Sequence, residues 1–300
     1  MIKTVLCLSF LFFGIAGFSQ PYIDIADVQY QLFTRAAYKD APSSNAATSL
    51  FKAGVTFPFQ MKNGNVILGG FEHLHHHFDY DSVTHSYGND LYSNEMHIGF
   101  KHDMKDPAWN YVVMGIAKIN ADLVSVRGTD WQAGGAVLFT WKKREALKWK
   151  FGLYYNREFF GNYFMALLGI EWKVNKRLNI FGTLPAAMNI EYRLHPKWTA
   201  GLAYRSVNSS YRTKDNPGDM YVLEGHKIWA DNQISAVINY YPFKNLTAYI
   251  GVGQTVFRYF QTYNSIHIKT SADPSLLPFK NQQFVYFGLA FRVRFDQEKN

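Results

Sequence analysis

The chain has 300 residues, with 31 Lys and Arg against 23 Asp and Glu, a formal net charge of +8, and 17% aromatic residues. The aromatic load and the 48% hydrophobic content exclude a disordered chain. After residue 18 there is no apolar run of about 18–20 residues, which excludes a helical membrane protein. Because heptads of Ala, Glu, Lys and Leu are also scarce, a coiled coil is excluded and a single β-rich unit remains.

Residues 1–19 have the pattern of a secretory signal peptide. Lys3 supplies the positive charge at the start, and Val5–Phe18 is an apolar stretch of the length expected for such a signal. Gly17 and Ser19 are small residues at the positions that a signal peptidase requires. We therefore expect cleavage after Ser19, the alternative being an N-terminal transmembrane anchor.

The cysteine count limits the chemistry of the mature chain. Cys7 is the single cysteine, and it lies within the expected signal. The expected mature domain, residues 20–300, therefore has no disulfide, no cysteine metal site and no cysteine nucleophile.

From Tyr22 onward the dominant period of the sequence is two residues. In Tyr92–Met104 the even-numbered side chains are mostly apolar, and the odd-numbered ones are polar or charged. The ranges 131–142, 148–158 and 283–295 repeat this alternation. Alternation predicts strands with one apolar face. Runs of about 10–14 residues exceed the usual 5–6 of soluble strands and match the length that crosses a bilayer at a tilt.

The connections between these strands alternate in length. Short turns rich in Gly, Asn, Asp and Pro are expected at 62–65, 105–108, 143–146, 175–176, 195–197 and 242–245. Longer polar segments are expected at 36–47, 79–90, 122–130, 213–225 and 262–281. Short turns at one end and long loops at the other are typical of an outer-membrane barrel, whose short turns face the periplasm.

The fold class predicted is all-β, a transmembrane antiparallel up-and-down barrel of 12–14 strands. The expected strands are 22–34, 47–60, 65–78, 91–104, 109–121, 131–142, 147–158, 162–173, 177–183, 187–194, 198–212, 226–241, 246–261 and 282–295. The ninth is short and runs into Pro185, which interrupts strand pairing and leaves twelve open as an alternative.

The tryptophans favour a membrane barrel over a soluble β protein. Most of them lie near the ends of expected strands, where an indole is half buried at a membrane–water interface: Trp109, Trp131, Trp141, Trp149, Trp172 and Trp198. The location expected is therefore the bacterial outer membrane.

The end of the chain resembles the C-terminal assembly signal of outer-membrane barrels. Gly288 is followed by Phe291 and Val293 and then by Phe295, although five more residues follow this last Phe. The segment 178–185, Leu-Asn-Ile-Phe-Gly-Thr-Leu-Pro, leads to Ile-Glu-Tyr-Arg-Leu at 190–194. Over residues 20–295 the chain resembles an uncharacterised outer-membrane barrel family of the DUF6268 type, found largely in Bacteroidetes-type bacteria. The resemblance implies fold and location, and no activity.

Charged residues on the polar face of the strands are the candidate lining of the lumen. A Lys or Arg facing lipid at mid-membrane costs about 2–4 kcal/mol, so these groups are expected to point inward. They are Glu95, His97, Lys101, Asp103, Lys118, Lys148, Lys150, Glu158, Glu171, Glu191, Arg193, Arg205, Asp231, Arg292 and Arg294. Two interpretations remain open: a pore with a mild preference for anions, or ion pairs that fill a narrow lumen.

Two histidine groups are weak candidates for chemistry. His73, His75 and His77 share one face of a strand and could hold a divalent metal. Their odd numbering places them on the same face as the apolar residues of this strand, which is expected to contact lipid. Polar aromatic residues at the extracellular edge of the barrel are the simpler interpretation. His85 and Ser86 suggest a lipid hydrolase at the rim. As adjacent strand residues they would point apart, so no catalytic residue is assigned.

The function expected is that of a non-enzymatic outer-membrane barrel, a small passive channel or a ligand-accommodating barrel, without a cofactor. The alternative is a structural or surface-interaction barrel with a plugged lumen, and a lipid-modifying enzyme ranks third. The expected partners are outer-membrane lipid and lipopolysaccharide, periplasmic chaperones and the barrel-assembly machinery. The basic residues form no contiguous patch, so nucleic acid is not expected.

Overall fold

The computed structural model describes residues 22–37, 45–80, 90–122, 128–213, 225–264 and 280–294. The expected signal peptide lies outside these residues. The strands are β1 (Tyr22–Ala37), β2 (Asn45–Gln60), β3 (Val66–Tyr80), β4 (Asp90–Asp103), β5 (Trp109–Ala121), β6 (Trp131–Arg144), β7 (Leu147–Glu158), β8 (Gly161–Lys173), β9 (Leu178–Leu184), β10 (Ala187–His195), β11 (Trp198–Thr213), β12 (Gly225–Phe243), β13 (Leu246–Asn264) and β14 (Gln283–Arg294). A 3-10 helix, η1, covers Gly128–Asp130. Within the described residues no helix is long and apolar enough to cross a membrane.

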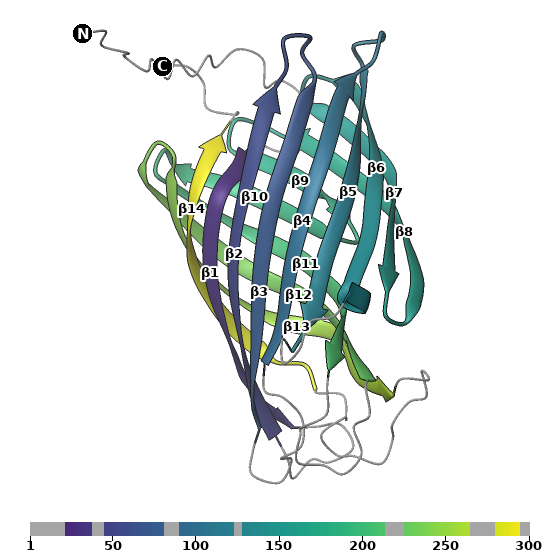
Figure 1. The fold of residues 1–300 in the computed structure, drawn as a ribbon. Helices are drawn as coiled ribbons and strands as arrows, with labels where there is room; N and C mark the ends of the chain where they lie inside the picture. Colours follow the sequence, from purple (N-terminus) through teal and green to yellow (C-terminus); the bar gives the residue numbers. More distant parts are fainter. Residues whose placement is uncertain are drawn as a thin grey trace, which may run out of the picture.

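The strands form a closed antiparallel barrel. Each strand pairs with its neighbours in sequence, and β1 pairs with β14 to close the ring (Figure 1). The described residues contain fourteen strands, so the alternative of twelve is wrong, and each of the fourteen expected ranges holds a strand. β1 begins and β14 ends at the same end of the barrel as the turns β2–β3 and β4–β5 (Figure 1). We call this end of the barrel the short-turn end, and the opposite end the long-loop end.

The outer wall of the barrel is apolar, whereas the buried charged side chains lie on the inner wall. In mid-strand positions Ile98, Leu153 and Phe164 are 64%, 65% and 70% exposed. By contrast, Lys118 and Glu158 are 3% and 5% exposed, on the inward face. An apolar outer belt around a polar interior is the arrangement of a transmembrane barrel, because lipid excludes charge.

Indole rings collect at the short-turn end of this belt. Trp109 on β5 stacks on Trp141 of β6 with ring centroids 6.0 Å apart. The ring centroid of Trp198, at the start of β11, lies 4.5 Å from that of Tyr240 on β12. Trp149, near the start of β7, is 38% exposed at the same end. Aromatic rings at this level suit the interface between lipid and water.

The β9–β10 hairpin is shorter than the strands on either side of it. β8 pairs with β9 only from Leu168 onward, and β11 pairs with β10 only as far as Arg205. The cause is local, because β9 ends at Leu184 and Pro185 follows with no backbone N–H to donate. Between residues 161–167 of β8 and 207–213 of β11, the wall therefore lacks its intervening strands.

Candidate functional site

The end of β11 crosses the barrel interior to reach β5. Arg212 pairs in parallel with Ala121, although β5 and β11 are not neighbours around the ring. The Asp122 N–H donates a hydrogen bond to the Arg212 carbonyl at 3.1 Å. This end of β11 is thus a partition, with one face toward β5–β7 and the other toward β3, where the Tyr211 ring lies 6.0 Å from that of His76.

Glu158 on β7 is the centre of the contact between β11 and β5–β7. Lys118 Nζ on β5 donates to Glu158 Oε1 at 2.8 Å, and the Ser210 hydroxyl of β11 donates to Oε2 at 2.6 Å. Gln132 of β6 and Asn156 of β7 donate to the same carboxylate at 3.0 and 2.6 Å. A buried ion pair is tolerated when its remaining hydrogen-bonding capacity is satisfied in this way. The network crosses the interior toward the long-loop end and joins β11 to β5–β7.

A second polar network lies beneath β12, β13 and β14 at the same end. Arg258 on β13 approaches Asp231 of β12, with Nε and Oδ1 3.6 Å apart and both side chains fully buried. Arg258 also hydrogen-bonds the side chain of Gln282, whose Nε2 donates to the carbonyls of Thr34 and Ala46 at 2.6 and 3.2 Å. These bonds join β13 to β1 and β2 inside the barrel.

At the short-turn end, side chains from opposite walls meet across the lumen. The Tyr22 ring of β1 contacts Phe181 of β9 edge to face, with centroids 5.5 Å apart. The Arg292 guanidinium lies 3.7 Å from the Tyr22 ring centroid. Arg294 of β14 forms an ion pair with Glu191 of β10 at 2.6 Å. The lumen is therefore crossed at both ends.

A recess outside this layer is lined by cations. It has a volume of about 560 Å³, and its Lys and Arg side chains come from the short turns and the adjoining strand ends: Lys173, Lys176, Arg177, Arg193, Lys197, Lys244 and Arg294. Such a concentration of positive charge attracts anions to the short-turn end of the barrel.

Between these two sets of contacts lies a chamber of about 730 Å³. Most of its lining is apolar and comes from the inward faces of β3 and β5–β8: Leu68, Val112, Met114, Ile116, Ala136, Leu138, Tyr154, Tyr163, Met165 and Leu167. Glu72, Glu95, His97 and Lys150 supply polar groups. A chamber with apolar walls and a few polar groups is the usual form of a site for a small molecule.

The chamber reaches the place where the wall lacks strands. Tyr163 and Met165 of β8 line it on one side of the gap, and Ser206 and Asn208 of β11 line it on the other. The gap is bounded at the long-loop end by the Phe159 N–H, which donates to the Ser210 hydroxyl at 2.9 Å. At the opposite edge the Ser206 N–H donates to the Ala186 carbonyl at 2.9 Å. We call this gap in the strand pairing, framed by β8, β11, Phe159 and Ala186, the lateral window.

Within the chamber, Glu95 and His97 are neighbours on one face of β4. His97 Nδ1 lies 3.8 Å from Glu95 Oε1. Gly70 on β3 makes room for the ring, since a Cβ there would lie 2.2 Å from His97 Nε2. Lys150 of β7, which is 5% exposed, lines the same chamber.

The other candidate lumen residues are distributed along the interior. Lys101 is buried and forms an ion pair with the exposed Asp103, with Nζ and Oδ1 2.7 Å apart. Lys148 forms an ion pair with Glu171, with Nζ and Oε2 3.5 Å apart. Arg205 lines a separate chamber of about 330 Å³ and donates to Asn189 at 2.9 Å. Polar side chains of the candidate set thus occur in both chambers and in the layers that close them.

The residues of the resembled assembly signal lie on β14. Gly288 faces inward beneath the Tyr249 ring, where a Cβ would lie 2.5 Å from Tyr249 Cζ. Phe291 is 46% exposed on the outer wall, and Val293 is half-buried on the same face. Phe295 lies outside the described residues.

The three candidate histidines of β3 do not converge on one point. His73 Nδ1 hydrogen-bonds Asn94 Oδ1 at 2.8 Å, whereas His75 and His77 both approach Asp90. His85 and Ser86 lie outside the described residues, so the hydrolase hypothesis stays a prediction.

Sequence reasoning missed several interior charges because bulges break the alternation. Asp24 and Asp27 are three residues apart, which strict alternation would place on opposite faces, yet both line the smaller chamber. The register of β1 against β14 shifts between Asp24 and Ala26, and this bulge turns both carboxylates inward. Arg258 is buried next to a similar shift in β13.

The sequence carries a signal of the apolar chamber. Residues 111–117 of β5 read Tyr-Val-Val-Met-Gly-Ile-Ala and do not alternate with polar residues. A strand that is apolar on both faces contacts apolar surroundings on both sides. Similar runs in β8 would have predicted an apolar patch inside the barrel.

Comparison with solved structures finds other barrels at low sequence identity. The outer membrane channel COG4313 of Pseudomonas putida F1 has 6% identity and a TM-score of 0.48, with 91% of this chain and 95% of that chain covered. The NanC porin has 9% identity and a TM-score of 0.38, covering 89% and 100%. The monoaromatic hydrocarbon channel TodX has 9% identity and a TM-score of 0.36, covering 91% of each chain. None of these likenesses transfers a solute to this chain.

Comparison with curated protein sequences finds no match. The model of one protein family, described as a domain of unknown function (DUF6268), matches residues 16–293, which include all of β1–β13 and almost all of β14. The chain therefore belongs to the DUF6268 family.

Proposed function

We propose that this protein is a non-enzymatic outer-membrane barrel that binds a small, mainly apolar solute in the chamber behind β5–β8 and exchanges it passively through the lateral window. The observation that carries this proposal is the apolar lining of a chamber of about 730 Å³ that extends to the gap between β8 and β11. Its volume is within the range of about 300–1,000 Å³ that is usual for small-molecule sites.

The lining decides which solutes the chamber favours. Transfer of apolar surface from water to side chains such as Met114, Ile116 and Leu138 is favourable by about 25 cal/mol per Å². An inorganic ion gains nothing from these side chains and loses hydration. Glu95 and His97, at the polar part of the lining, would orient a polar group on the solute through hydrogen bonds.

The proposed location follows from the outer wall. The apolar belt and the indole rings at its edge would be covered by outer-membrane lipid and lipopolysaccharide. Delivery of such a barrel would require periplasmic chaperones and the barrel-assembly machinery, with Gly288 and Phe291 as part of the recognised strand.

A structural barrel with a plugged lumen is the second candidate. The specific observation in its favour is the pair of cross-lumen contacts, Glu158 with Ser210 and Arg294 with Glu191. In that case the chamber would be a space that no solute enters.

Thiol labelling distinguishes these candidates. Met114 and Ala136 form a direct cross-strand pair in the chamber, and the chain's single cysteine, Cys7, lies in the expected signal. We expect a Met114→Cys variant in lipid nanodiscs to react much faster with the apolar reagent N-phenylmaleimide than with a charged methanethiosulfonate, when each rate is divided by that reagent's rate with free cysteine. Adding Ala136→Trp should slow the reaction by more than about tenfold, because the indole on the direct cross-strand partner would cover the thiol.

Ala133→Trp is the matched control, since Ala133 is exposed on the outer face of the same strand. It should leave the labelling rate of Met114→Cys unchanged. Equal labelling rates with the two reagents, each taken relative to free cysteine, would indicate a water-filled pore instead. Failure of both reagents to react with the folded variant would favour the plugged barrel.

A further inference from the structure

We propose that His75, His77 and Asp90 form a binding site for a zinc-class divalent cation on the outer face of the barrel, near the long-loop end. Each residue offers one ligand atom, an imidazole nitrogen or a carboxylate oxygen, and these three atoms all lie within 4.8 Å of one another. This site is independent of the chamber, because it lies on the opposite side of the wall.

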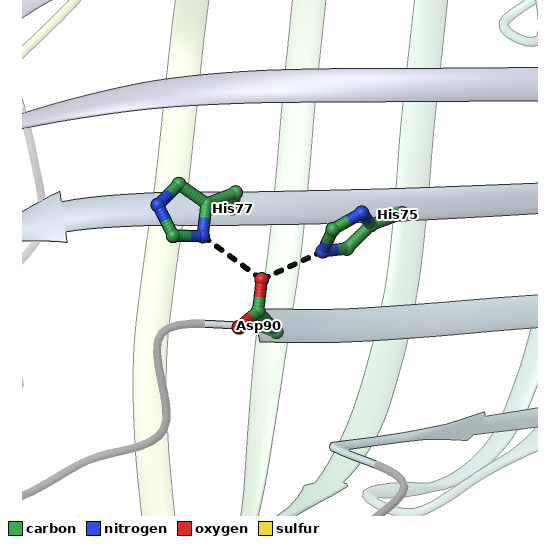
Figure 2. A group of neighbouring side chains, drawn as sticks. All are labelled: His75, His77 and Asp90. Atoms are coloured by element: carbon green, nitrogen blue, oxygen red, sulfur yellow. Dashed lines mark hydrogen bonds and ion pairs between the residues drawn. The ribbon is translucent and has the colours of Figure 1, made fainter.

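Strand register brings the three side chains together. His75 and His77 are two residues apart on β3, so they lie on the same face. Asp90, the first residue of β4, is the direct cross-strand partner of His77. Figure 2 shows both imidazoles directed toward the same carboxylate oxygen, with His75 Nε2 at 2.6 Å and His77 Nδ1 at 2.9 Å from Asp90 Oδ1.

The His75 ring is held in its orientation by its neighbour on β4. Tyr92 is its direct cross-strand partner, and the two rings stack with centroids 4.5 Å apart and an interplanar angle of 10°. A ligand that is already oriented loses less freedom when the metal binds. His73, one position further along the face, is held by Asn94 and stays outside the group.

Two imidazole nitrogens and one carboxylate oxygen are a common donor set for zinc. Zn–N distances are about 2.0–2.1 Å and Zn–O distances about 2.0–2.2 Å, in four-coordinate geometry. Small side-chain rotations would replace the two hydrogen bonds with bonds to one ion. The fourth position would be taken by water. Calcium and magnesium prefer oxygen donors and would bind poorly here.

The site is accessible to ions in water. The side chains of His75, His77 and Asp90 are 31%, 46% and 37% exposed. On the outward face of β3 the apolar residues end at Phe71, and beyond His77 comes Asp79, which forms an ion pair with Arg35. The group therefore lies beyond the apolar belt, at the level of lipid headgroups or water.

Zinc titration of the purified barrel tests the proposal. The full chain, processed by the host and prepared without a polyhistidine tag, is titrated with zinc chloride in detergent by calorimetry. We expect one zinc ion per barrel and a rise in thermal stability, because the ion binds only the folded arrangement. His75→Ala and His77→Ala should each weaken zinc binding by more than about tenfold, and Asp90→Asn should weaken it to a smaller extent.

His73→Ala is the matched control, on the same strand and face but outside the group. Its zinc affinity should equal that of the wild-type protein. The heat-dependent shift of folded barrels in gel electrophoresis verifies that each variant is folded. The proposal is overturned if wild-type protein binds no zinc in the micromolar range, or if His73→Ala lowers the affinity as much as His77→Ala does.

Discussion

The Ser210 hydroxyl on β11 donates a hydrogen bond to Glu158 on β7 at 2.6 Å, across the interior of the barrel. β7 and β11 are separated by three strands around the ring, so no sheet hydrogen bond joins them. This contact exists because β11 extends beyond its pairing with β10, and its end, still paired with β12, turns inward toward β5. It crosses the lumen next to the Phe159–Ser210 hydrogen bond that bounds the lateral window.

The first prediction concerns the buried carboxylate of this contact. Glu158→Gln leaves the Lys118 ammonium without its charged partner at a site where the two side chains are 2% and 3% exposed. Loss of one member of a buried ion pair costs about 3–5 kcal/mol. Urea unfolding in detergent, followed by tryptophan fluorescence, should show this loss. Glu145→Gln breaks the exposed ion pair with Lys142 and should leave the midpoint nearly unchanged.

The second prediction concerns ion conductance. Because Tyr22 and Phe181 meet across the lumen, the wild-type barrel should show only small single-channel steps in a planar bilayer. The double variant Tyr22→Ala/Phe181→Ala removes both rings and should raise the conductance several-fold. Phe164→Ala, on the outer wall, should not change it. Large wild-type steps that the double variant leaves unaltered would refute this account of the constriction.

A third prediction follows from the close approach of an aromatic ring to a glycine. A Cβ at Gly251 on β13 would lie 2.2 Å from Cζ of Tyr286 on β14. Gly251→Ala should therefore displace that buried ring and destabilise the barrel by about 1–3 kcal/mol. In a Tyr286→Ala background the same substitution should cost much less, and a double-mutant cycle measures the difference. Equal costs in both backgrounds would show that the ring is not the obstacle.

The fourth prediction tests contact of the outer wall with lipid. Leu153 is 65% exposed in the middle of β7, so Leu153→Arg should destabilise the barrel in vesicles by about 2–4 kcal/mol. Phe59 is equally exposed but lies next to the end of β2. Phe59→Arg should cost about 0–1 kcal/mol, because the membrane interface tolerates charge. Similar costs at both positions would argue against a bilayer around this belt.

The sequence alone determined the strands and the direction of their two faces. Alternation is a local property, since successive side chains of a strand point to opposite sides whatever its partner is. The apolar face of Tyr92–Met104 and the other long segments of alternating apolar and polar residues therefore predicted an antiparallel barrel with an apolar exterior. The count of fourteen followed once Pro185 proved to lie in a tight hairpin between β9 and β10.

Only the tertiary structure decided how the interior is divided. Bulges near Asp24 and Arg258 change the facing of charges, and they depend on the register of the partner strand. The inward turn of β11, the lateral window and the approach of Asp90 to His75 and His77 depend on relative strand lengths and pairings. Contacts between residues far apart in the chain produce no repeating pattern in the sequence. They can be seen only in the closed barrel.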